Sequence, residues 1–307
     1  MPHPLDPYPT PEIRDATTRE LARTLGGETH VIGQTVEGRP LLAACVPAKR
    51  LGAPRVLVTG NIHGVEWVSC QVAMGMLQEL RGGDVGLQQL QERAELWVIP
   101  CMNPDGYHRT FVSEGHGSMA GLRTNANGVD LNRNFPLPPG ELRKRLPGAG
   151  SLVPGNATYV GTGPLSEPET QAIERLMVEQ KFHASINVHS FLGKVIPARA
   201  LTGHHARTYK KLAKLMAAAQ ATAYGRLSSA WFDTFTGELE DHQHHAHNMW
   251  AACMETFTFA ASVRQHLRAP NLFWRFNPRD PQRWVKNDVP AVTAFLLAAL
   301  DEARPDP

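Results

Sequence analysis

Long apolar runs and a strong excess of charge of either sign are both missing from this chain of 307 residues. No uninterrupted apolar run approaches the roughly 18 residues that a membrane-spanning helix requires. The 31 Lys and Arg nearly balance the 29 Asp and Glu, and a net charge of +2 creates no strong field. We therefore expect neither nucleic acid nor a membrane as partner, but a small molecule or a peptide.

Cysteine is scarce as well, and the chain has only Cys45, Cys70, Cys101 and Cys253. They form no C-x-x-C pair and no dense disulfide framework, so buried free thiols are expected. Residues 1–10 are proline-rich and polar, whereas a signal peptide needs a basic segment followed by an apolar one. Together these features favour a reducing, cytoplasmic location.

A single α/β domain covering residues 1–307 is expected, because no Ser/Gly-rich linker and no abrupt change in composition marks a boundary. Residues 1–25 are treated as an N-terminal extension. After an edge hairpin at 29–47, predicted strands and helices alternate as a largely parallel sheet requires. The strands are expected at 55–59, 95–100, 184–188 and 251–256, and helices at about 67–81, 204–223, 240–250 and 289–303.

A long stretch without periodicity, residues 107–165, follows a turn signal at 103–106 and is rich in Gly, Pro and Asn. A loop of this length in a compact domain is usually functional or disordered. Its middle, 123–136, concentrates amide and guanidinium donors, which bind carboxylates and polarise carbonyls. The alternative is a surface loop with ordinary Asx turns. Residues 166–169 then have the pattern of a capping box with a proline in the first turn, and predict a helix to about residue 180.

His63 stands at the carboxyl end of a predicted buried strand, at the edge where open α/β sheets bind ligands. Glu66 follows three residues later, at about the first turn of the next helix, so an imidazole and a carboxylate can face one point. Zn²⁺ accepts both ligand types. Of the 14 histidines, only His63 has a glutamate three places on. A helix cap with a solvated side chain is the alternative interpretation.

Two more residues belong to the same edge of the predicted sheet. His189 follows another strand, and Glu255 lies among apolar neighbours in the last one. Two histidines and one carboxylate leave a fourth zinc position open for water, which is typical of a catalytic site. A free glutamate beside that water would supply the base.

Four further histidines gather in the predicted helix 240–250: His242, His244, His245 and His247. Such a cluster suggests metal binding, but it lacks the cysteine or carboxylate partners of a closed site. We therefore expect a solvated or partly buried helix face here.

The order of these motifs resembles that of the zinc metallocarboxypeptidases, the family of the pancreatic carboxypeptidases A and B with bacterial and cytosolic relatives. The resemblance spans about residues 55–260 and implies a mixed, mostly parallel, twisted sheet of eight strands between helices. It also implies one Zn²⁺ bound by His63, Glu66 and His189, and hydrolysis of a C-terminal amide bond in a peptide or peptide-like substrate with a free carboxylate.

The resemblance assigns roles to the remaining motifs. Asn132 and Arg133 would grip the terminal carboxylate of the substrate. Arg123, with Arg109 as the second candidate, would polarise the scissile carbonyl. Glu255 would act as general base and acid.

One position departs from the family pattern. Where the family's carboxypeptidases carry a mobile tyrosine, this chain has Asp233, and Tyr224 is the candidate substitute. The same alignment places Glu240 at the floor of the specificity pocket, which would favour a cationic side chain.

Other activities stay open at this point. The loop 123–136 also resembles that of cytoplasmic murein tripeptide amidases, members of this family that cut a γ-D-glutamyl bond to diaminopimelate. Deacylation of N-acyl amino acids needs the same zinc and base with a different pocket. A non-catalytic peptide-binding module is disfavoured, because the three ligands and the glutamate are all present.

Overall fold

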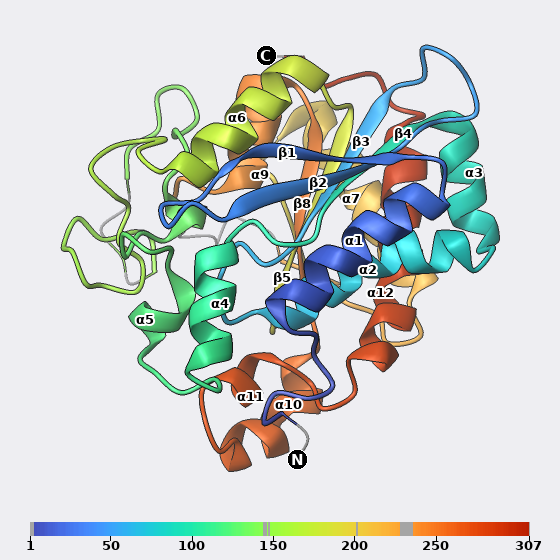
Figure 1. Ribbon diagram of the computed structural model, residues 1–307. Helices are drawn as coiled ribbons and strands as arrows, with labels where there is room; N and C mark the ends of the chain where they lie inside the picture. Colours follow the sequence, from blue (N-terminus) through green and yellow to red (C-terminus); the bar gives the residue numbers. More distant parts are fainter. Residues whose placement is uncertain (1–2, 144–145, 147, 201, 228–235, 307) are drawn as a thin grey trace.

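The computed structural model describes the chain except for residues 1–2, 144–145, 147, 201, 228–235 and 307. Its described residues form an eight-stranded sheet in the order β1-β2-β4-β3-β5-β8-β6-β7, with helices on both faces (Figure 1). The strands are β1 (Glu28–Gln34), β2 (Pro40–Val46), β3 (Arg55–Thr59), β4 (Glu95–Ile99), β5 (Ala184–Ser190), β6 (Lys194–Pro197), β7 (Gly225–Arg226) and β8 (Trp250–Thr256). The expected α/β class is confirmed.

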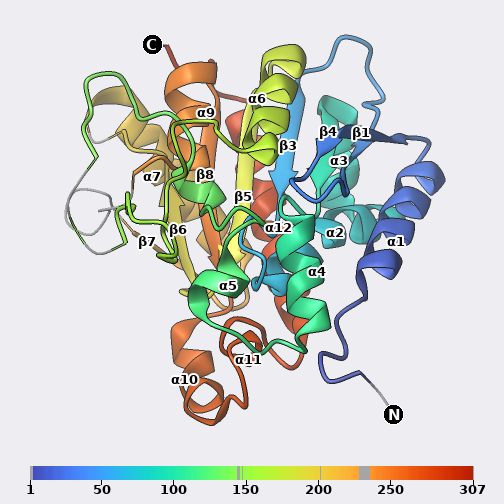
Figure 2. The ribbon, with the colours of Figure 1, turned by 60° about the vertical axis from the view of Figure 1, so that its left-hand side comes forward.

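The helices follow the same alternation along the chain. They are α1 (Pro11–Thr24), α2 (Trp67–Arg81), α3 (Val85–Arg93), α4 (Pro104–Val112), α5 (Met119–Arg123), the 3-10 turn η1 (Leu131–Arg133), α6 (Pro168–Gln180), α7 (Gly203–Ala219), α9 (Leu239–His247), α10 (Phe259–Arg268), α11 (Phe273–Phe276) and α12 (Pro281–Ala299). The helices α1, α2, α7 and α12 pack on one face of the sheet and α6 and α9 on the other (Figures 1 and 2).

Successive side chains of the central strands pack alternately against the helices on one face of the sheet and against those on the other. Val56 and Val58 of β3 join the core beneath α2, while Leu57 between them joins the core beneath α6. Successive strand residues point to opposite faces, so a strand buried on both sides must be apolar at every position. This is why β3 and β4 are largely continuous apolar runs. In β5, Ser185 and Asn187 are buried polar side chains, and both form hydrogen bonds with Gln243 of α9.

The direction of the strands places a crevice at the centre of the sheet. The strands β4, β3, β5 and β8 are parallel, while β2 pairs antiparallel with β1 and β4, and β6 pairs antiparallel with β8. From β3 the chain passes through α2 to β4 on one side, whereas β5, on the other side, is entered from α6 on the opposite face. Such a switch opens a ligand crevice at the carboxyl ends of β3 and β5.

Local chemistry explains where some boundaries differ from those expected. The turn signal at 103–106 begins helix α4, because the side chain of Asn103 accepts the N–H of Gly106 and Pro104 occupies the first turn. The aperiodic loop is therefore shorter than predicted, and it also contains α5 and η1. The helix α12 begins at Pro281, capped by Asp280, and continues through Pro290.

The capping box predicted at 166–169 is wrong in detail. The N-cap residue of α6 is Glu167, and no side-chain hydrogen bond caps the helix, although Pro168 does occupy its first turn. The hydroxyl of Ser166 donates instead to Glu167, and Glu169 is buried, where it accepts from the amide of Asn125. The side chains of Ser166 and Glu169 thus bond to other side chains instead of capping the backbone of α6.

The segment expected as an N-terminal extension contains α1, which begins after Thr10 caps the N–H of Ile13. Its Arg14 is buried, with the guanidinium 4.4 Å from the ring centre of Tyr107. None of the helices in the described part of the chain is both long and apolar enough to cross a bilayer.

Candidate metal centre and catalytic cavity

The seven site residues predicted from the sequence all line one cavity of about 300 Å³. The cavity lies at the carboxyl ends of β3, β5 and β8, where the topology places the crevice. These residues are His63, Glu66, Arg123, Asn132, Arg133, His189 and Glu255.

His63 lies in the tight connection between β3 and α2. Asn61 adopts a positive φ of 51°, and its side-chain amide donates to the carbonyl oxygen of His63 at 2.9 Å. Gly64 packs against Gly106 of α4, where a Cβ on residue 64 would lie 2.5 Å from a Cα atom. Only glycine permits this approach, which holds the connection against α4 and buries the His63 ring.

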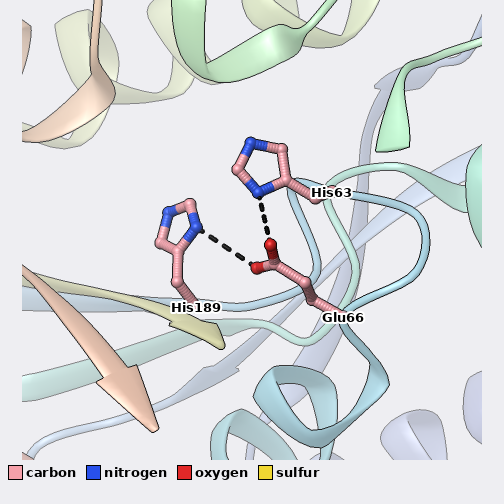
Figure 3. A group of neighbouring side chains, drawn as sticks. All are labelled: His63, Glu66 and His189. Carbon is pink, nitrogen blue, oxygen red and sulfur yellow. Dashed lines mark hydrogen bonds and ion pairs between the residues drawn. The ribbon is translucent and has the colours of Figure 1, made fainter. Parts of the chain in front are cut away.

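Glu66 lies between His63, in the connection that follows β3, and His189, in the adjacent strand β5 (Figure 3). Its Oε1 is 2.8 Å from Nδ1 of His63, and its Oε2 is 3.3 Å from Nδ1 of His189. The backbone N–H of Ser190 donates to Oε2 at 3.1 Å. One ligand atom from each of the three side chains lies within 4.8 Å of the other two.

Asp130 supports this cluster from behind. Its Oδ1 is 3.1 Å from Nε2 of His63, and its Oδ2 accepts from Nε and Nη2 of Arg123 at 2.9 and 2.8 Å. Because a carboxylate only accepts, Nε2 of His63 must donate to it. A carboxylate behind a histidine is the usual outer shell of a zinc site, since it fixes the ring and its tautomer. Asp130 is a site residue that the motifs alone do not identify, and the only signal for it in the sequence is its place in the donor-rich loop 123–136.

Nδ1 of His63 and Oε1 of Glu66 are 2.8 Å apart, so either a proton or a metal ion must lie between them. A neutral His63 that donates from Nε2 turns its Nδ1 lone pair toward the carboxylate of Glu66. Burial and Arg123 lower the pKa of His63, but Glu66 and Asp130 raise it, with a net upward shift. Burial raises the pKa of Glu66, yet His63 and His189 hold it well below its usual range. Two imidazoles around an ionised carboxylate therefore fit a Zn²⁺ ion, and three ligands are the number of a catalytic site.

Glu255 stands next to this cluster without belonging to it. Its carboxylate lies within 4.8 Å of a ring nitrogen of His189, its register partner across β5 and β8. Burial, and then the Glu66 carboxylate, raise the pKa of Glu255 to about 8. The charge of a bound Zn²⁺ would lower this value toward the range in which a base operates near pH 7. Among the described residues, Oε2 of Glu255 has no hydrogen-bond partner.

The two arginine candidates are separated by the structure. Arg123 lines the cavity, and its Nη1 lies 3.9 Å from Glu66. Arg109 is outside it and donates to the backbone carbonyls of Gly121, Thr124 and Asn125. Arg109 therefore holds the segment that carries Arg123, and of the two arginines Arg123 is the one that lines the cavity.

Asn132 and Arg133 also line the cavity, from η1. The side-chain oxygen of Asn132 accepts the N–H of Leu239, the first residue of α9, at 2.9 Å. Nε of Arg133 donates to the carbonyl of Gly148 at 2.9 Å, and its Nη1 lies 3.7 Å from Glu238. A guanidinium and an amide that line the same cavity as the metal ligands can bind a carboxylate.

Two residues expected to contribute to substrate specificity, Glu240 and Tyr224, do not line the cavity. Glu238, rather than Glu240, is the acidic side chain from the start of α9 that lines the cavity among the described residues. Tyr224 is buried in the core, where its hydroxyl donates to Asp288 and accepts from the N–H of Phe257, so it does not replace the missing tyrosine. Asp233 lies outside the described residues.

Comparison with known proteins shows which family the chain resembles. The model of the zinc carboxypeptidase family matches residues 18–265. Human carboxypeptidase D is 29% identical over 259 residues, which cover 68% of this chain and 17% of that protein. The catalytic chain of human carboxypeptidase N is 32% identical over 179 residues, covering 52% and 36%. The chain thus spans well under half of these curated relatives.

Solved structures share the fold at low sequence identity. Bovine thrombin-activatable fibrinolysis inhibitor, in complex with tick carboxypeptidase inhibitor, superposes with a TM-score of 0.78 at 18% identity, covering 96% of this chain and 98% of that one. Carboxypeptidase A from Helicoverpa armigera superposes with a TM-score of 0.75 at 20% identity, covering 96% and 74%. Since the family model covers most of the chain, this protein belongs to the zinc carboxypeptidase family.

Proposed function

We propose that this chain uses one Zn²⁺ to hydrolyse the C-terminal amide bond of peptides, or of peptide-like molecules with a free carboxylate. The carrying observation is that a single cavity joins the His63 cluster and Glu255 to Asn132 and Arg133. A substrate whose carboxylate is bound on one wall presents the adjacent amide bond to the other. Membership of a zinc-dependent family supports the same reaction.

The chain's residues divide the chemistry among them. When bound, Zn²⁺ lowers the pKa of a water molecule towards about 7 and polarises a carbonyl. Glu255 takes the proton of that water and returns it to the leaving amine. Arg123 donates to the oxygen that gains negative charge. Asn132 and Arg133 orient the scissile bond by fixing the carboxylate beside it.

The test uses purified, zinc-assayed protein and a set of short peptides that end in Lys, Arg, Phe or Leu, each as free acid and as amide. Products are identified by mass spectrometry. Loss of single C-terminal residues from the free acids alone supports the proposal, and equal cleavage of the amides overturns it. A preference for Lys or Arg would assign the pocket floor to Glu238, which lines the cavity.

The competing activities are separated by the same experiment. A murein tripeptide and a set of N-acyl amino acids are included in the mixture. Release of diaminopimelate alone would move the assignment to an amidase, and cleavage of acyl amino acids alone to a deacylase. Bound zinc with no hydrolysis of any substrate would leave a binding module.

We also propose a cytoplasmic location and no nucleic-acid or membrane partner. The four cysteines are buried and free of disulfide bonds, which supports a reducing compartment. The near balance of charges supports a small, peptide-like partner.

A further inference from the structure

A second group of two histidines and a glutamate lies between α6 and α9, which sit side by side on one face of the sheet (Figures 1 and 2). Oε2 of Glu174 is 2.7 Å from Nε2 of His242 and 3.0 Å from Nε2 of His247. The ligand atoms all lie within 4.8 Å of one another. The expectation that these histidines lack a carboxylate partner is therefore wrong, because Glu174 of α6 lies beside two of them.

The nitrogen–oxygen distances in this group can be compared with those among His63, Glu66 and His189. Its histidine nitrogens lie 2.8 and 3.3 Å from the carboxylate oxygens of Glu66, against 2.7 and 3.0 Å at Glu174. In a tetrahedral site with bonds of about 2.1 Å, ligand atoms are about 3.4 Å apart. The contacts at Glu174 would therefore open by roughly 0.4 to 0.7 Å when an ion binds.

The surroundings hold the ligands in position while leaving them accessible. The ring of His242 stacks on Phe135 with centroids 5.7 Å apart. The side chains of His242, His247 and Glu174 are 7%, 12% and 26% exposed, so an ion can enter from solvent.

Glu174 and His247 line a surface depression. Two cationic side chains, Lys181 and Arg304, line the same depression. The guanidinium of Arg304 is engaged, since it donates to the backbone carbonyls of Lys181 and His247. The second of these contacts holds the backbone of a ligand residue. The positive charge of the arginine is thus directed at carbonyl oxygens and not at the ligand atoms.

We propose that Glu174, His242 and His247 form a second binding site for a divalent transition-metal ion such as Zn²⁺, which cross-links α6 and α9. Solvent would complete its coordination. The donor set of two imidazoles and one carboxylate suits Zn²⁺, Co²⁺, Ni²⁺ and Cu²⁺ better than Mg²⁺ or Ca²⁺, which prefer oxygen ligands.

An ion at this site would also affect the substrate cavity, because α9 contacts a residue that lines it. The helix α9 begins at Leu239, whose N–H is held by Asn132, and His242 is less than one turn further on. An ion between α6 and α9 would restrain this helix relative to the sheet. It would do so without contacting the ligands of the catalytic centre.

Calorimetric titration of tag-free, zinc-loaded protein with Zn²⁺, repeated with Co²⁺, tests the proposal. One saturable event with a stoichiometry of one ion per chain is expected beyond the ion already bound. Glu174→Gln and His247→Ala should each weaken this event by at least the roughly 10–100-fold that loss of an outer-shell partner costs. Added Zn²⁺ should raise the Tm of the wild type and not of these variants.

His245→Ala is the matched control. His245 lies on the same helix, but its Nε2 donates to the carbonyl of Arg199 and is not available as a ligand. This variant should retain the second event. Circular dichroism of all variants before addition of metal verifies that they fold. Absence of a second event in the wild type, or an unchanged event in both Glu174→Gln and His247→Ala, would overturn the proposal.

Discussion

The carboxylate of Asp130 provides a direct test of how the metal ligands are held in position. It is fully buried. It accepts hydrogen bonds from Nε2 of His63, from Nε and Nη2 of Arg123, and from the backbone N–H of Asn132. Asp130→Asn keeps the size of the side chain but turns one oxygen into an NH₂ group. Either His63 or Arg123 then faces a donor where it had an acceptor, because both of them donate.

Two magnitudes follow from this geometry. Loss of the outer-shell partner of a ligating histidine costs about 10–100-fold in metal affinity, or about 1.4–2.8 kcal/mol. Removing one charge of a buried ion pair costs about 3–5 kcal/mol of folding free energy. We therefore expect Asp130→Asn to bind zinc at least tenfold more weakly and to unfold at lower urea concentration.

The assay is zinc competition with a chromophoric chelator, alongside urea unfolding of the zinc-free protein. Asp105→Asn is the matched control, because Asp105 is also buried and accepts from Thr35 and Arg39 at 2.7 Å each. It should lose stability with no change in zinc affinity. The reasoning is refuted if Asp130→Asn binds zinc as tightly as the wild type.

Three further predictions address the base, the carboxylate site and the core. Glu255→Gln should keep its zinc and lose about 10²–10⁴-fold in kcat; an unimpaired rate would remove Glu255 from the mechanism. Arg133→Ala should raise KM for free-acid peptides by about 10–100-fold, the equivalent of one charge-assisted hydrogen bond; an unchanged KM would contradict carboxylate binding. Burial raises the pKa of Asp288 to about 6, from 3.8. The folded state therefore holds this proton more tightly, so the stability that it contributes is complete below pH 3.8 and is lost as pH rises through 6. Compared with Asp288→Asn in urea unfolding, the wild type should lose about 3 kcal/mol over this window; parallel curves would show that Asp288 does not titrate there.

The sequence predicted those parts of the fold and site that local pattern encodes. The strand before His63 and the helix after it were found because apolar runs and helical spacing are visible in short windows. His189 and Glu255 were found because each follows or ends such a run. The topology then brings these strand ends together, as parallel pairing requires.

The parts that were missed depend on partners distant in sequence. The carboxylate of Glu174 is 68 residues from His242, so no window contains both. The start of α12 was misplaced because Pro290 lies within a helix that tertiary packing stabilises. Asn103 satisfies a helix cap as readily as a turn, and only the chain that follows distinguishes the two.

The contact between Glu66 and Ser190 joins residues 124 positions apart. Until β3 and β5 have paired, the chain offers a metal only its local His63 and Glu66, and the full ligand set exists in no partly folded species that lacks this pairing. Tight zinc binding therefore requires that β3 and β5 have paired, and the free energy of zinc binding adds to the stability of the state in which they are paired. Zinc depletion would therefore lower the free energy of unfolding of this chain as well as its catalytic activity.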